Sequence, residues 1–195
     1  MRQLIIALLL IAPVLSIGKP AAIQGFGLLV GSEGNGFSYR AYVRPQPSWA
    51  AGGKITLFDI KADDEFVFYN YYTQQAESVG DRYLLIIPIF GFINYFPFEG
   101  KIANNLSPYI SLQAGPLITL DGDENNDRFF NRWTTADSYF TFGGNINLGV
   151  SFVWVGGTSI AVSAGYDIFP MRVKVDGKSR YDGLTLEFSF TRPLR

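Results

Sequence analysis

The segment FTFGGNINLGVSFVW, residues 140–154, decides the fold class because its side chains alternate in polarity with a period of two. The odd positions are small or polar up to Val153. The even positions are almost all apolar: Phe140, Phe142, Gly144, Ile146, Leu148, Val150, Phe152 and Trp154. Successive side chains of a strand point to opposite faces, whereas a helix would scatter these residues around its circumference. The segment is therefore predicted to be a β-strand with one apolar face and one polar face.

The same alternation recurs along the chain. It is clean in residues 37–44, 109–114, 159–168 and 184–191, and weaker in residues 23–30 and 49–60. Residues 82–96 are apolar on both faces, but Pro88, Gly91 and Pro97 favour a strand over a buried helix. We therefore expect an all-β chain with eight strands.

The connections between these strands alternate in length. Residues 45–48, 98–107 and 155–157 form one set, and residues 32–36, 62–81, 121–137 and 173–180 form the other. Three of the four segments in the second set are long, polar or rich in Asp and Asn. Short turns at one rim and long loops at the other are typical of an antiparallel up-and-down barrel with both termini at one end.

The direction of the apolar face separates a membrane barrel from a soluble exported, lipocalin-like barrel, whose apolar face points inward. The clean strands reach about 10 residues, which is long enough to cross a bilayer at a tilt. The polar face is rich in Gly, Ser, Thr and Asn, and aromatic residues gather towards strand ends, as interfacial girdles require. These features predict an eight-stranded antiparallel up-and-down transmembrane β-barrel, and the soluble barrel stays as the alternative.

The N-terminus has the pattern of a signal peptide. Arg2 precedes a 12-residue apolar run, residues 4–15, which is too short to span a bilayer as a helix. We expect cleavage after Ser16, so that residues 1–16 are the signal peptide and residues 17–195 the barrel domain. A buried N-terminal helix or an anchor is the other interpretation. Export of such a barrel predicts a location in the cell outer membrane.

The composition limits the chemistry. The chain has 195 residues, a formal net charge of −1, and neither Cys nor His. Without Cys it forms no disulfide or thiolate metal site, and without His it lacks the commonest general base and metal ligand. The near-neutral charge makes nucleic acid an improbable partner. We predict no catalytic residue, no cofactor and no enzymatic activity.

Two segments resemble small bacterial outer-membrane barrels of the OmpA type. Gly183, Leu186, Phe188 and Phe190 match the C-terminal assembly signal of such proteins, in which a Gly precedes alternating hydrophobic and aromatic positions. Residues 108–115, PYISLQAG, resemble the PYxxLGAG strand of the OmpA-type transmembrane domain. The resemblance implies folding by the barrel assembly machinery in outer-membrane lipid. Residues 191–195 depart from it, since many relatives end at the aromatic residue.

Two loops carry candidate sites. Asp121, Asp123 and Asn125 match the first ligands of a calcium loop, but Asn126 and Arg132 replace the Gly and Glu that such a loop needs. We interpret this weak metal candidate as a solvated loop tip. Charged residues at the start of loop 62–81 are interpreted as a water-facing rim: Asp59, Lys61, Asp63, Asp64 and Glu65. Exposed aromatic residues such as those within 66–72 suit adhesion or ligand contact. We expect them instead to extend the hairpin beyond the membrane and to pack on each other.

Several charged residues fall on the predicted inner face. Charges there must pair or accept hydrogen bonds, so an internal ion-pair network is expected, which would fill the lumen as a plug. Its predicted members are Arg40, Arg44, Gln113, Asp167 and Glu187, with Lys54 as a further partner.

These features predict a non-enzymatic outer-membrane barrel, structural or binding an unknown surface ligand through its long loops. A lipid-modifying enzyme with a carboxylate or Ser site at the loop rim is the alternative from another class. A narrow solute channel is a third, since eight strands leave little lumen.

Overall fold

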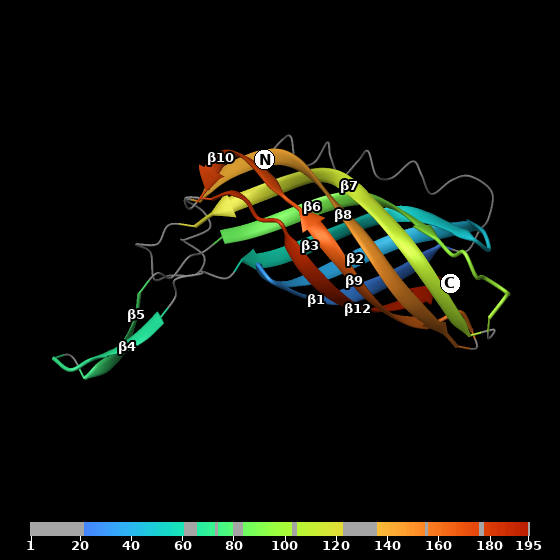
Figure 1. Cartoon of the computed structure of the whole chain (residues 1–195), viewed down its shortest axis with the longest axis horizontal. Coiled ribbons are helices and arrows are strands. Elements are labelled where there is room, and N and C mark those ends of the chain that lie inside the picture. The colour runs from blue at the N-terminus through green and yellow to red at the C-terminus, as the bar shows by residue number, and fades with distance from the viewer. Residues whose placement is uncertain are drawn as a thin grey trace.

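The computed structural model describes residues 22–60, 66–72, 74–79, 84–102, 105–122, 136–154, 156–175 and 178–194. Strands that share one continuous sheet close into a barrel (Figure 1). They are β1 (Ile23–Gly31), β2 (Gly34–Gln46), β3 (Trp49–Ile60), β6 (Leu84–Tyr95), β7 (Leu106–Asp121), β8 (Asp137–Val153), β9 (Ser159–Ile168) and β12 (Gly183–Pro193). Within these residues we found no helix with the length and apolarity that a membrane span needs.

Neighbouring strands are antiparallel, and the order around the barrel is β1-β12-β9-β8-β7-β6-β3-β2. The first and last strands close the seam, in a register that pairs Ile23 with Pro193 and Gly31 with Thr185. The predicted eight-stranded antiparallel barrel is therefore confirmed. The strand predicted at residues 109–114 was too short, because β7 continues beyond both ends of that range and includes Pro116. Between β6 and β7 the pairing stops after Pro88 and Leu117 and resumes at Gly91 and Ala114, as expected where proline supplies no N–H.

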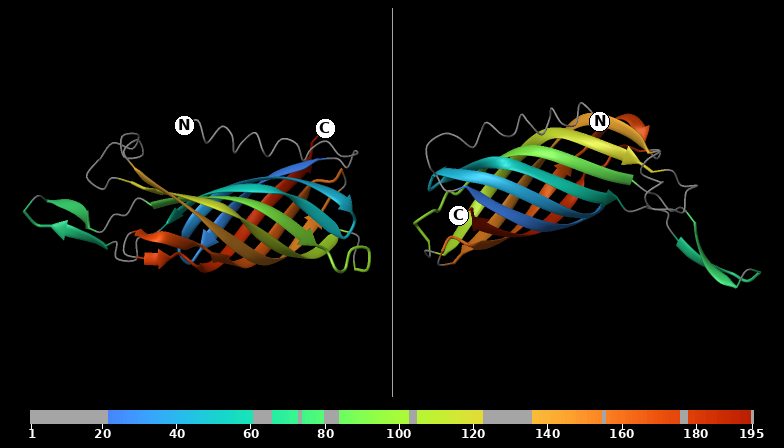
Figure 2. Two further views of the ribbon diagram at one scale, coloured as in Figure 1. Left: turned by 90° about the horizontal axis from the view of Figure 1, so that it is seen from above. Right: turned by 180° about the vertical axis from the view of Figure 1, so that it is seen from behind.

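Two small hairpins lie outside the barrel sheet. β4 (Phe66–Asn70) pairs with β5 (Gln75–Val79), and β10 (Pro170–Val175) pairs with β11 (Lys178–Arg180). The first lies where the hairpin extension was expected, and it forms a two-stranded sheet of its own. The second lies partly in residues 173–180, which were predicted to be a loop. The sequence pattern missed these strands because they are too short to show a clear alternation of polarity. Both hairpins lie at the end of the barrel where the long connections emerge (Figures 1 and 2).

The outer wall of the barrel is apolar. Along β8 the even positions point outward, and the exposed fractions reach 64% at Phe142 and 63% at Leu148. On β12 the outward Leu184 is 69% exposed. Soluble monomers rarely expose contiguous apolar surface on this scale, so the wall is suited to lipid. The structure confirms the prediction that the apolar face of the strands points outward.

The interior has three layers along the barrel axis. A large apolar cluster lies towards the long-loop end, made by Leu29, Phe58, Ile60, Leu84, Ile86, Phe90, Leu117, Phe169 and Tyr181. A smaller cluster lies towards the short turns, made by Ala50, Phe96, Tyr109 and Ala161. Polar and charged side chains fill the middle. The expectation of a small, polar inner face was therefore wrong at the long-loop end. At the short-turn end, small polar side chains are buried beside the smaller cluster: Ser107, Ser151, Ser159 and Thr191. The larger cluster also explains why β6 is apolar on both faces, since its inward Leu84, Ile86 and Phe90 belong to it.

Candidate functional site: a polar layer in the barrel lumen

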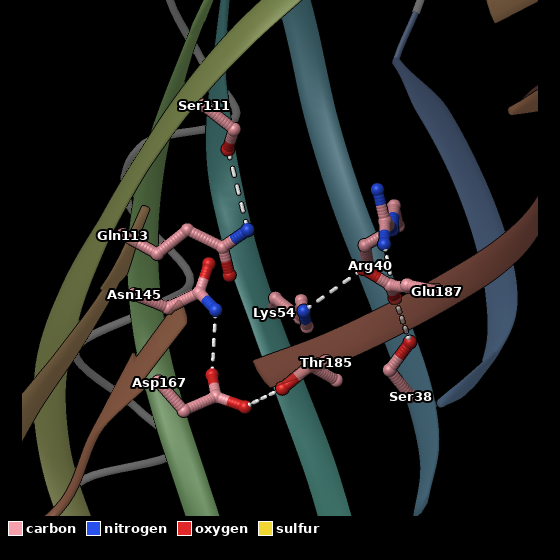
Figure 3. A network of polar contacts seen from close by, with 9 residues as sticks. All are labelled: Ser38, Arg40, Lys54, Ser111, Gln113, Asn145, Asp167, Thr185 and Glu187. Carbon is pink, nitrogen blue, oxygen red and sulfur yellow. Dashed lines mark hydrogen bonds and ion pairs between the residues drawn. The ribbon is translucent and has the colours of Figure 1, made fainter. Parts of the chain in front are cut away.

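Glu187 on β12 is the centre of the first group in this layer. Its carboxylate accepts hydrogen bonds from Ser38 Oγ at 2.7 Å and from Lys54 Nζ at 3.1 Å, and it forms an ion pair with Arg40 (Figure 3). The side chains of Arg40, Lys54 and Glu187 are 8%, 6% and 4% exposed. Buried charges of this kind persist in proteins only when paired and hydrogen-bonded, as they are here.

The barrel register brings these residues together. Arg40 and Lys54 are direct partners across β2 and β3. Glu187 lies on β12, and β1 separates that strand from β2. The Glu187 side chain extends over β1 at Gly27, which is the partner of Ser38 on β2. A Cβ atom on Gly27 would lie 2.6 Å from both Glu187 Oε1 and Ser38 Oγ. Gly27 therefore provides the space for this contact. The sequence analysis missed its role because a Gly in a Gly-rich strand carries no periodic signal.

Asp167 on β9 is the centre of the second group. Its carboxylate accepts hydrogen bonds from Asn145 Nδ2 at 2.5 Å and from the hydroxyl of Thr185 (Figure 3). Asn145 is its direct partner across β8 and β9. Gln113 lies in the same layer, but its amide donates to Ser111 Oγ at 3.2 Å. The structure thus brings Arg40, Lys54, Gln113, Asp167 and Glu187 into one layer. It contains the group around Glu187, the group around Asp167, and Gln113, which is hydrogen-bonded to Ser111.

Arg44 lies apart from this layer. Its guanidinium forms an ion pair with Glu99 at 2.9 Å, donates to the carbonyl of Pro47 and lies 4.4 Å from the centre of the Phe96 ring. Arg44 has the same inward parity as Arg40, but four strand residues separate the two by about 13 Å along the chain. That distance places Arg44 at the short-turn rim, so its prediction as a member of the central network was wrong.

Most of the remaining predicted residues lie outside the described part of the chain. Asp121 ends β7, whereas Asp123 and Asn125 lie outside the described residues. In the part of the chain that the structure describes, no cluster of three His, Cys, Asp or Glu residues could hold a metal ion. Asp59 lies on β3 near the long-loop end, while Lys61, Asp63, Asp64 and Glu65 are likewise outside the described residues.

The segment predicted as an assembly signal forms the last barrel strand. Gly183 begins β12 and points inward, where an added Cβ would lie 2.2 Å from Ser32 Oγ. The side chains that follow it at alternate positions point outward, with exposed fractions of about one half: Leu186, Phe188 and Phe190.

The arrangement closes the lumen. The layer carries two positive charges, Arg40 and Lys54, and two negative charges, Glu187 and Asp167, so its formal charges balance. Apolar clusters cover it on both sides along the axis. Side chains that neutralise one another between two apolar clusters suit a structural plug.

Comparison with known proteins supports the fold. No protein-family profile matches the chain, and a sequence search among curated proteins found no match. Among solved structures, Neisserial surface protein A aligns with a TM-score of 0.61 and 13% identity, covering 90% of this chain and 98% of that chain. The N-terminal β-barrel domain of OprF from Pseudomonas aeruginosa aligns with a TM-score of 0.50 and 9% identity, covering 89% and 98%. Both are eight-stranded outer-membrane β-barrels. The chain therefore has the fold of the small eight-stranded outer-membrane β-barrels.

Proposed function

We propose that this chain is a non-enzymatic outer-membrane barrel that presents a binding surface at its long-loop end. The observation that carries the proposal is the combination of an apolar outer wall with a filled lumen. The wall is suited to lipid, and the filled lumen leaves the loop end as the part that can meet a partner. In this proposal residues 1–16 are the export signal. The barrel assembly machinery recognises the strand that contains Gly183, Leu186, Phe188 and Phe190.

The β4–β5 hairpin is the proposed binding surface. It follows β3 and precedes β6 at the long-loop end, and it extends away from the barrel (Figure 2). Three tyrosines at its tip are strongly exposed, Tyr69 at 62%, Tyr71 at 85% and Tyr72 at 98%. Tyrosine supplies a large, rigid contact area with a polar end, and it is enriched in binding surfaces for that reason.

The absence of enzymatic activity is supported by the engagement of the buried carboxylates. Glu187 is held by Ser38, Arg40 and Lys54, and Asp167 by Asn145 and Thr185. Neither group is presented to a substrate at the loop rim. Because the chain contains no His, the usual base that would activate a serine is also missing.

The orientation is tested with single cysteines, which the cysteine-free chain makes unambiguous. Tyr71→Cys should react on intact cells with a maleimide that does not cross membranes. Lys101→Cys, in the exposed turn between β6 and β7 at the opposite end, is the matched control and should react only after the outer membrane is permeabilised. Equal labelling of the two positions on intact cells would contradict the proposed orientation.

The binding role is tested by photo-crosslinking in living cells. A benzophenone amino acid at position 71 should give discrete crosslinked species, and the same amino acid at position 101 should not give those species. If position 71 gave no crosslinked product while the barrel was folded and labelled at the surface, the hairpin would not be the binding surface.

A further inference from the structure

A small cavity lies inside the barrel between the two hydrogen-bonded groups of the polar layer. Its polar lining comes from Lys54, Thr56, Gln113, Asn145 and Asp167. Its apolar lining comes from the neighbouring cluster: Leu29, Phe58, Pro88, Phe90 and Phe169. The cavity measures about 10 Å³, which is close to the smallest volume that holds one water molecule.

Two of the residues that line this cavity carry an amide oxygen without a hydrogen-bond partner. Gln113 Oε1 and Asn145 Oδ1 are both buried without a hydrogen bond, and their residues are only 7% and 8% exposed. Buried polar atoms are nearly always hydrogen-bonded to protein or to ordered water. The two oxygens therefore indicate a donor that occupies the space between the groups.

The orientation of Asn145 is fixed by its other contact. Its amide nitrogen donates to the Asp167 carboxylate at 2.5 Å, and reversing the amide would place two acceptor oxygens against each other. The Asn145 oxygen must then face away from Asp167. In the close view it points towards the side of the layer that holds Gln113 (Figure 3).

The Lys54 ammonium has N–H donors that are not used in its hydrogen bond to Glu187. An ammonium carries three N–H donors, and its hydrogen bond within the described residues is the one to Glu187 Oε2. Lys54 lines the same cavity as Gln113 and Asn145. A molecule that accepts one hydrogen bond and donates two would satisfy all three groups.

We propose that one buried water molecule occupies this cavity, accepting from Lys54 Nζ and donating to Gln113 Oε1 and Asn145 Oδ1. The balanced charges of Arg40, Lys54, Glu187 and Asp167 leave no excess negative charge to attract a cation. A cation would also lie beside the Lys54 ammonium and be repelled by it. The water joins the Glu187 group and the Asp167 group into one network that crosses the lumen.

The direct test is a high-resolution crystal structure of the chain refolded in detergent, before and after a soak in rubidium chloride. The expected result is a density peak within hydrogen-bond distance of Lys54 Nζ, Gln113 Oε1 and Asn145 Oδ1, without anomalous scattering after the soak. An anomalous rubidium peak would show that a cation occupies the cavity, and it would overturn the proposal. A dry cavity with a reversed Gln113 amide, donating to Asn145, would overturn the proposal.

A double-mutant cycle tests the network in solution. Lys54→Met and Gln113→Leu share no direct hydrogen bond among those found, so without the water their effects on the unfolding equilibrium should be coupled only as much as those of other residues that line the same cavity. With the water, the double variant should depart from independence by about fivefold or more. Lys54→Met with Phe90→Leu is the control, because Phe90 lines the same cavity but offers no hydrogen bond to a water. Equal behaviour of the two cycles would contradict the bridge.

Discussion

Replacing Glu187 by Gln should destabilise the barrel strongly. The substitution keeps the side chain's shape but removes the charge that Arg40 and Lys54 share, and both cations are less than one tenth exposed. Removing one partner of a buried ion pair typically costs about 3–5 kcal/mol, because the remaining charge is left uncompensated away from water. The loss of unfolding free energy should lie near the upper end of this range, because two cations depend on one carboxylate.

Urea unfolding in phospholipid vesicles measures this effect, with the folded fraction read from the gel mobility of unheated samples. Glu99→Gln is the matched control, because Glu99 pairs with Arg44 in a bridge whose side chains are 25% exposed. A pair this exposed contributes about 1 kcal/mol or less. If Glu187→Gln cost no more than Glu99→Gln, the central role of Glu187 would be refuted.

A rescue variant separates charge from packing. Replacing Arg40, Lys54, Glu187 and Asp167 together by Met, Met, Leu and Asn removes all four charges of the layer. Replacing a complete buried ion-pair group by uncharged residues is often neutral or stabilising. The quadruple variant should therefore be more stable than Glu187→Gln alone. A quadruple variant less stable than the single one would show that steric fit, and not charge, governs the layer.

Three further predictions concern the wall and the lumen. Leu148→Arg, on the exposed apolar wall, should lower the free energy of unfolding in vesicles by about 2–4 kcal/mol, while Tyr71→Arg on the hairpin should stay within about 0.5 kcal/mol; similar values for both would argue against a lipid-facing wall. Gly149→Ala places a Cβ 2.5 Å from Tyr109 Cζ and 2.7 Å from Ser163 Cβ, so urea unfolding should show a loss of about 1–3 kcal/mol. Gly91→Ala, whose nearest neighbour is a backbone oxygen at 3.9 Å, should be nearly neutral, and an equal loss would contradict the packing. Planar-bilayer recordings of the folded chain should show no discrete conductance, and reproducible channel events would contradict the closed lumen.

The fold could be predicted from the sequence because a period of two survives in most strands. Residues 140–154 carry it over their whole length, and a β-strand places every even position on the same face, whereas a helix does not. The alternating connection lengths then indicated an up-and-down barrel. Residues 82–96 were harder to interpret, because β6 has lipid on one face and an apolar cluster on the other, so both faces select the same residue types.

The polar layer could be predicted only in part. The inward parity of Arg40 and Glu187 follows from the alternation, as does the need to pair buried charges. Which residues of different strands lie at the same level along the barrel axis depends on the strand register. The alternation does not determine this register, because a shift by two residues keeps every side chain on the same face. Arg44 was therefore assigned to the layer although it lies at the rim. Gly27 went unnoticed because its contribution is the absence of a side chain.

The orientation of the apolar wall is the central claim, and a spin-label scan of β8 tests it most directly. Single cysteines at positions 145–152 of the cysteine-free chain would carry a nitroxide, and the barrel would be folded in phospholipid vesicles. Collisions with oxygen, which concentrates in lipid, should peak at the outward positions Ile146, Leu148, Val150 and Phe152 and fall at Asn145, Asn147 and Ser151. Peaks at those even positions for a water-soluble nickel complex instead of oxygen would contradict the account, because the apolar face would then meet water.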